Sequence, residues 1–144
     1  MRRLFGIALV ALVPCAAHAQ AKLEFLNINP QSTAPFTPAV RVGNILYLAG
    51  QLGTKDGKVV PGGIGPETRQ ALQNIKDLLE KTGSDMEHVV KCTVFLADMR
   101  EWPAMNDVYR TMFTAGKFPA RSAFGTTGLA LDARTEIECI AVVK

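Results

Sequence analysis

The sequence contains very little histidine and cysteine. Its 144 residues include two histidines and three cysteines, and no Cys-x-x-Cys pair occurs. Zinc sites take three or four protein ligands, mostly from these residue types, so we expect no metal site. A Ser-His-Asp or Cys-His mechanism would have to use His88, because the other histidine belongs to the leader described next. His88 lies in the polar segment GSDMEHVV, which favours a surface position.

Long hydrophobic runs are also missing. The apolar stretch near the N-terminus, residues 4–13, is too short to span a bilayer. It follows two arginines and precedes an Ala-His-Ala triplet, which is the pattern of a secretory signal peptide. We predict a signal peptide over residues 1–19, cleaved before Gln20, and a periplasmic or secreted mature chain without a transmembrane segment. A lipoprotein anchored through Cys15 is the alternative, although Pro14 fits the lipidation signal poorly.

The mature chain has no basic excess. The leader holds two of the 16 lysines and arginines and no acidic residue, so the remaining 14 face 13 acidic residues. The basic isoelectric point therefore belongs largely to the leader. Binding of nucleic acid normally needs a clearly basic surface, so we expect no nucleic-acid partner.

Hydrophobic periodicity predicts two helices and several strands. Helical spacing extends from Pro66 to Gly83 and again from about Arg100 to Phe113. Strands are predicted over residues 41–53, 88–99 and 135–144, with a hairpin turn at Asp56-Gly57. Residues 120–130 are predicted as a strand or an extended segment broken by glycines. This order contains too few βαβ units for a doubly wound sheet. We predict one α+β domain over residues 20–144, a mixed sheet with two helices packed on one face.

Arg121 lies in the segment KFPARSAFG, which otherwise has the character of a buried strand. Desolvating a guanidinium without an anion is costly, so its side chain requires a partner. Glu136 and Glu138 are the candidates within the chain, and they share one face of the last predicted strand. A carboxylate on a ligand is the other candidate. The small residues around Arg121, behind a backbone fixed by Pro119, favour the ligand because they leave room for a concave site.

Other candidate residues have structural interpretations as well. Tyr109 shares one face of the second predicted helix with Trp102 and Met105 and is expected in the core. Asn106 lies one residue off that stripe and suits a cleft or solvent equally well. Cys92 and Cys139 lie in strand-like runs, where they could form a disulfide or pack as free thiols.

Six motifs in order resemble the RidA family, also called YjgF or L-PSP proteins. They are VGNILYLAGQLG, GGIGPETRQALQNIKDLLE, VVKCTVFLADM, MNDVYRTMF, FPARSAFG and EIECIAVVK. The resemblance implies a chorismate-mutase-like fold and a homotrimer with sites in the clefts between subunits. It also implies hydrolysis of reactive 2-imino or 2-enamino acids to 2-keto acids and ammonia, without metal or organic cofactor. Arg121 matches the family arginine that binds the substrate carboxylate, and Glu136 matches the glutamate associated with placing the attacking water.

The chain departs from the family pattern within the implied site. Phe36 stands where many deaminating members have tyrosine, Ala49 where they have serine or threonine, and Ala123 where cysteine is frequent. With Asn106 and Arg121, these residues make up the predicted substrate-binding set. Each of the two missing hydroxyls is worth about 1 kcal/mol if it made one useful hydrogen bond, which together lowers the rate about ten- to a hundredfold.

The sequence leaves more than one function open. Imine or enamine hydrolysis at an arginine-anchored site between subunits is the prediction we favour. A non-catalytic binding protein for small carboxylate metabolites, on the same trimeric scaffold, is the alternative that the missing hydroxyls favour. Endoribonuclease activity, suggested by the older family name, is opposed by the near-neutral charge and the single histidine. A holdase chaperone is neither supported nor opposed.

Overall fold

The computed structural model describes residues 21–144 of the chain. The predicted signal peptide and Cys15 lie outside the described residues, so the leader stays a prediction. No helix in the described part is both long and apolar enough to cross a membrane.

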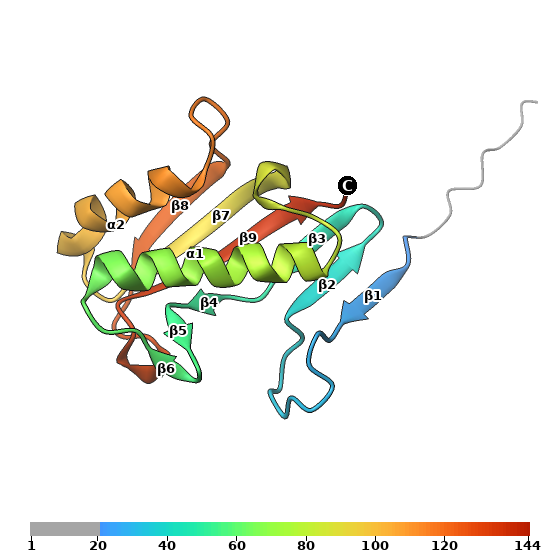
Figure 1. Cartoon of the computed structure of the whole chain (residues 1–144), viewed down its shortest axis with the longest axis horizontal. Helices are drawn as coiled ribbons and strands as arrows, with labels where there is room; N and C mark the ends of the chain where they lie inside the picture. Colours follow the sequence, from blue (N-terminus) through green and yellow to red (C-terminus); the bar gives the residue numbers. More distant parts are fainter. Residues whose placement is uncertain (1–20) are drawn as a thin grey trace, which may run out of the picture.

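A mixed β-sheet forms one layer, and both long helices lie on the same face of it (Figure 1). The strands follow the order β1-β2-β3-β9-β7-β8, and β4 also pairs with β9. In this sheet β7 and β8 run parallel, whereas the other pairs are antiparallel. The strands are β1 (Leu23–Leu26), β2 (Ala39–Val42), β3 (Ile45–Leu48), β4 (Gln51–Leu52), β7 (Val89–Leu96), β8 (Ala120–Gly125) and β9 (Thr135–Val142). The predicted α+β architecture is confirmed.

The two helices bury the apolar stripes that predicted them. α1 (Ile64–Lys81) begins slightly before the expected Pro66. α2 (Trp102–Tyr109) is shorter than predicted, but a 3₁₀ turn at each end extends it over almost the whole predicted range. The short 3₁₀ turns are η1 (Met86–His88), η2 (Met99–Glu101), η3 (Arg110–Met112) and η4 (Ala130–Asp132).

The predicted hairpin at Asp56-Gly57 is confirmed. It joins β5 (Thr54–Lys55) to β6 (Lys58–Val59), which form a separate two-stranded sheet. Both turn residues have positive φ, 52° for Asp56 and 76° for Gly57. Such a turn matches the twist of the flanking strands, which explains the preference for this residue pair.

The strand predicted over residues 41–53 is wrong in detail, because the chain reverses within it. β2 and β3 form a hairpin around Gly43, whose φ of 61° is a left-handed conformation that glycine adopts without strain. The chain then leaves β3 at Ala49 and rejoins the sheet as β4. Within residues 120–130, predicted as a strand or an extended segment broken by glycines, β8 ends at Gly125. β1 lies outside every predicted strand.

A disulfide joins the two central strands. Cys92 on β7 and Cys139 on β9 are paired in register, with their Cα atoms 4.1 Å apart, and their sulfur atoms are bonded. Both residues are buried under the helices. The pairing decides between the two states that the sequence left open.

The start of β9 is fixed by a buried carboxylate. Glu67 of α1 is 4 % exposed, and its Oε2 accepts a hydrogen bond of 2.7 Å from the backbone N–H of Arg134. The Arg134 guanidinium lies 3.7 Å from the other oxygen of Glu67 and also pairs with Glu101. A buried carboxylate needs such partners to offset its desolvation. These contacts hold the chain directly before Glu136.

The face of the sheet opposite to the helices, called the open face below, is rich in apolar side chains. Side chains alternate along β9, so Ile137 and Cys139 face the helices while Glu136 and Glu138 belong to the open face. Large apolar residues on the open face that remain exposed in the single chain are Leu23, Phe25, Tyr47 and Phe124. Exposed large apolar side chains on one face of a sheet are typical of an interaction site.

Candidate functional site

The side chain of Arg121 is held in place by α2. Arg121 lies on β8, at the edge of the sheet, and its Nη2 donates a hydrogen bond of 2.8 Å to Oδ1 of Asn106. Its guanidinium carbon lies 4.5 Å from the centre of the Tyr109 ring and 5.7 Å from that of Trp102. Both distances suit cation–π contacts. The guanidinium therefore has neutral neighbours that orient it without neutralising its charge.

Neither glutamate predicted as a partner for Arg121 within the chain pairs with it. The ion pairs among residues 21–144 join other groups, and none includes Arg121. The reason is topological, since β7 lies between β8 and β9. Arg121 also contacts a helix, whereas Glu136 and Glu138 belong to the open face. No carboxylate among residues 21–144 therefore neutralises the charge of Arg121.

A cavity of about 290 Å³ opens beside Arg121. It is lined by Asn106, Tyr109, Arg110, Phe118, Pro119 and Arg121. The lining includes two arginines and no acidic residue. Its size and charge suit a small anionic molecule better than a neutral one.

Tyr109 forms the floor under the guanidinium. Its residue is 3 % exposed, and its hydroxyl has no hydrogen-bond partner among residues 21–144. Burial raises the pKa of Tyr109 to about 12, although the positive charge of Arg121 opposes the shift. The phenol therefore stays neutral at physiological pH. Its ring contributes to the site by supporting Arg121.

Glu136 belongs to a second cluster of residues. It is half-buried on β9, and its carboxylate lies directly against the backbone of Gly50. A Cβ atom added at Gly50 would come within 2.0 Å of Oε1 of Glu136, so no other residue fits there without displacing the carboxylate. Ala49 precedes this glycine, and the carbonyl oxygens of both residues accept hydrogen bonds from the amide of Gln51.

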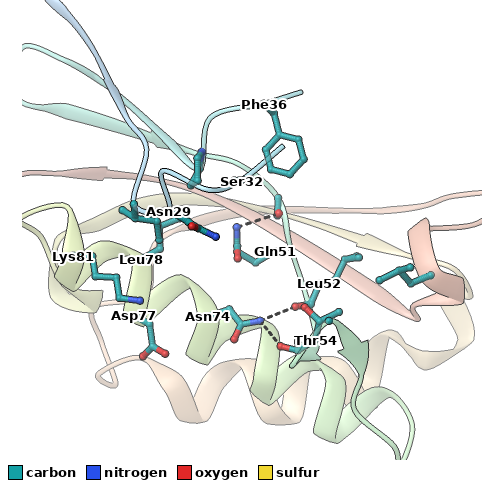
Figure 2. Close-up of a pocket in the computed structure, with 15 residues that line it drawn as sticks. Asn29, Ser32, Phe36, Gln51, Leu52, Thr54, Asn74, Asp77, Leu78 and Lys81 are labelled. Atoms are coloured by element: carbon teal, nitrogen blue, oxygen red, sulfur yellow. Dashed lines mark hydrogen bonds between the residues drawn. The ribbon is translucent and has the colours of Figure 1, made fainter. Parts of the chain in front are cut away.

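Figure 2 shows a larger cavity, of about 460 Å³, next to this cluster. The loop between β1 and β2, the β4–β5 segment and α1 enclose it, and Phe36 and Gly50 belong to its lining. The amide of Asn74 donates hydrogen bonds to the carbonyl oxygens of Leu52 (3.0 Å) and Thr54 (2.9 Å), which ties α1 to the β4–β5 segment. Phe36 is 61 % exposed.

The structure divides the predicted site residues into two groups. The arginine group consists of Arg121, Asn106 and Ala123, which lie on β8 and α2 on the helix-covered face. The glutamate group consists of Glu136 on β9, Ala49 directly after β3, and Phe36 in the loop between β1 and β2. Within one chain the two groups do not meet, because β7 and the thickness of the sheet separate them.

Some residues near the site were not identified from the sequence, and one candidate lies elsewhere. Arg110 and Phe118 line the cavity of Arg121 but were not predicted. The signal for Arg110 was its place directly after Tyr109 on the predicted helix. His88 bonds to Asp85 through Nδ1, at 2.7 Å, and belongs to neither group. Among residues 21–144, no three His, Cys, Asp or Glu side chains gather in a way that could hold a metal ion.

Comparison with known proteins identifies the family. The family model for endoribonuclease L-PSP matches residues 27–143. A mouse protein named 2-iminobutanoate/2-iminopropanoate deaminase is 42 % identical over 115 residues, which cover 78 % of this chain and 84 % of the mouse protein. A RutC family protein of Pyrococcus horikoshii is 42 % identical over 81 % of this chain and 94 % of its own.

Solved structures give the same result. Yeast Mmf1 superposes with a TM-score of 0.75 at 35 % identity, covering 88 % of this chain and 98 % of the yeast chain. RidA from an Antarctic Psychrobacter superposes with a TM-score of 0.73 at 30 % identity, covering 79 % of this chain and 93 % of the other. The two helices on one face of a mixed sheet are therefore the fold of these proteins. The chain belongs to the endoribonuclease L-PSP family, which is the RidA or YjgF family that its motifs resemble.

Proposed function

We propose that the chain hydrolyses 2-imino acids, or the enamines in equilibrium with them, to 2-keto acids and ammonia. The observation that carries the proposal is Arg121, an oriented guanidinium beside a small cavity with no carboxylate paired to it. A carboxylate on the ligand completes that arrangement with strong, charge-assisted hydrogen bonds. Curated relatives named 2-iminobutanoate/2-iminopropanoate deaminase, at about the identity reported above, support the same activity.

The reaction requires that the electrophilic carbon of the imine is fixed in position, that a water molecule is oriented toward it, and that protons can be transferred. Arg121 binds the carboxylate and so fixes the adjacent C=N carbon. The Glu136 carboxylate orients a water molecule and accepts a proton from it as the water oxygen bonds to that carbon. At the same time the C=N electron pair moves to the nitrogen, which takes up a proton. The resulting carbinolamine passes its hydroxyl proton to the nitrogen by way of Glu136 and loses ammonia as its C–N bond breaks and the C=O bond forms. No step uses a metal or an organic cofactor.

The active unit in this proposal is a homotrimer with sites between subunits. One chain holds Arg121 and Glu136 on opposite faces of the sheet, with β7 between their strands, so in this proposal a complete site takes Arg121 from one copy and Glu136 from another. The exposed apolar residues of the open face, such as Phe25 and Phe124, support self-association. A closed ring of three copies would bury these residues and use the same contact three times.

A second function on the same scaffold is the binding of a small carboxylate metabolite without turnover. The observation that favours it is the lack of hydroxyl or thiol side chains at Phe36, Ala49 and Ala123. Ala123 also packs partly against the core, so its backbone is the part available to a ligand. Arg121 serves both functions, and release of ammonia distinguishes them.

The proposed location is the periplasm or the exterior of the cell. The N-terminal pattern of a signal peptide supports it, as does the disulfide between Cys92 and Cys139, because disulfides persist mainly in oxidising compartments. The mature chain, residues 20–144, would then be a single domain. Its imines would come from amino-acid oxidation outside the cytoplasm.

The test uses imines generated in the assay by an L-amino-acid oxidase. Residues 20–144 are compared with the Arg121→Ala variant, and semicarbazide captures the imine that escapes hydrolysis and thereby measures spontaneous decay. We expect the wild-type chain to lower semicarbazone yield and to accelerate release of keto acid and ammonia. The Arg121→Ala variant should not. No acceleration with either small or large side chains would reject hydrolysis, and titration with 2-keto acids would then test the binding function.

A further inference from the structure

The cavity beside Arg121 contains a second cation, Arg110. The side chain of Arg110 is exposed at the end of α2 and lines the same cavity. It forms no ion pair within residues 21–144. Arg100 and Arg134, by contrast, pair with carboxylates of the chain. Arg110 and Arg121 thus leave two positive charges in one small space.

The rest of the lining gives that space a defined chemistry. Tyr109, Phe118 and Pro119 form apolar walls between and around the two arginines, and no acidic side chain contributes. Two like charges facing a shared cavity repel one another unless an anion lies between them. A short carbon chain with a carboxylate at each end satisfies both guanidinium groups and covers the apolar walls.

From this arrangement we infer that the preferred substrates are 2-imino dicarboxylates, with the carboxylate next to the imine on Arg121 and the distal carboxylate on Arg110. The inference rests on the proposed hydrolysis and names its substrate class. Arg121, fixed by Asn106 and two aromatic rings, is suited to the carboxylate that must place the reacting carbon. Arg110, exposed and unpaired in the described chain, can adjust to the distal group. Water and a 2-imino dicarboxylate give a 2-oxo dicarboxylate and ammonia, so an oxidation of acidic amino acids must supply the substrate.

The experiment compares two imines that differ in one terminal group. L-glutamate and L-norvaline have the same number of carbons, and suitable oxidases convert them to imines with a terminal carboxylate and a terminal methyl group. The wild-type chain is compared with Arg110→Met, Arg110→Lys and Arg69→Met. Arg69 is an exposed arginine of α1 that lines none of the cavities described, so its replacement controls for the loss of one positive charge.

We expect the wild-type chain to favour the glutamate-derived imine in kcat/KM by about tenfold, the scale of one exposed charge-assisted contact. Arg110→Met should remove that preference by lowering kcat/KM for the glutamate-derived imine far more than for the norvaline-derived imine, Arg110→Lys should keep part of it, and Arg69→Met should keep all of it. Equal kcat/KM for both imines in the wild-type chain would overturn the inference while leaving the proposed hydrolysis intact. An equal loss for both imines in Arg110→Met would also overturn it, since Arg110 would then act on structure or assembly.

A binding arm separates this inference from the hydrolysis itself. If no imine is turned over, the probes are 2-oxoglutarate and 2-oxopentanoate, titrated against the wild-type chain and Arg110→Met. Tighter binding of 2-oxoglutarate that depends on Arg110 supports the ligand class even though the hydrolysis has failed. Equal affinity for the two compounds overturns it.

Discussion

The two halves of the proposed site are built to different degrees within one chain. The arginine group is complete, because Asn106, Trp102 and Tyr109 of α2 already hold the guanidinium of Arg121. The glutamate group is open, since Glu136 rests against Gly50 beside a loop whose Phe36 is largely exposed. In the proposed hydrolysis, substrate anchoring would therefore be organised by the fold of the single chain, whereas placement of the water would depend on assembly.

The largest expected effect is on stability, and it concerns β7, the strand that supports both halves of the proposed site. β7 is paired with β8, which carries Arg121, and with β9, which carries Glu136, and the Cys92–Cys139 disulfide joins β7 to β9. Replacing both cysteines with alanine should lower the free energy of unfolding by about 2–4 kcal/mol, because the unfolded chain loses a long closed loop. Denaturant titration measures the change.

A reductant provides the control for that prediction. It should destabilise the wild-type chain by a similar amount and leave the double-alanine variant unaffected. Equal stability of the oxidised and reduced wild-type chain would show that the disulfide is not a support of the sheet.

The two halves should respond differently in kinetics. Glu136→Gln keeps the shape of the side chain but removes the base, so kcat should fall about a hundredfold while binding of a 2-keto acid product is retained. Arg121→Met should abolish that binding. Steady-state kinetics with product titration separates the two outcomes, and loss of product binding in Glu136→Gln would show that the glutamate also anchors substrate.

Gly50 offers a test that leaves both charged residues in place. Gly50→Ala puts a methyl group where the Glu136 carboxylate now lies, so kcat should fall about tenfold as the carboxylate moves. Gly65→Ala is the matched control, because a Cβ atom there would meet Val108 at 3.7 Å, an ordinary contact. Unchanged kcat in Gly50→Ala would mean that the observed position of Glu136 is not the working one.

The smallest effect is expected at Tyr109. Tyr109→Phe keeps the ring under Arg121 and removes a buried hydroxyl without a partner, so activity should be unchanged and stability equal or slightly higher. Because the folded-state pKa is raised to about 12, the neutral phenol stabilises the fold below pH 10, and this contribution is lost between pH 10 and 12. The wild-type chain should therefore lose stability more steeply than Tyr109→Phe over that range. A large loss of activity in the variant would give the hydroxyl a direct role.

Much of the fold follows from local patterns in the sequence. The helical spacing that predicted α1, the apolar runs of β7 and β9, and the Asp56-Gly57 turn each depend on neighbouring residues, and each was confirmed. The reversal at Gly43 was missed because a glycine inside a β-like run marks either a turn or a bulge, and only pairing between strands decides which.

The candidate site was less predictable because it depends on register. Sequence spacing placed Glu136 and Glu138 on one face of a strand, but it could not show that β7 would separate them from Arg121. It could not pair Cys92 with Cys139 either, since that pairing needs the alignment of two distant strands. The sequence did not decide whether Asn106 faces a cleft or solvent. The structure decides it, because β8 lies at the sheet edge beside α2 and Arg121 donates a hydrogen bond to Asn106. The roles of Phe36, Ala49 and Ala123 stay predictions, since the effect of these residues on binding or rate depends on a site completed by a second chain.

The most direct test of the two-chain site is complementation between inactive variants. Differently tagged Arg121→Ala and Glu136→Gln chains are unfolded together, refolded into mixed assemblies, and assayed for imine hydrolysis after tandem affinity purification. If each site takes Arg121 from one subunit and Glu136 from the next, every mixed trimer has both residues in one of its three sites, and activity rises well above that of either parent. If purified mixed assemblies stay as inactive as the parents, the two groups do not form one site across a subunit boundary, and the account is contradicted.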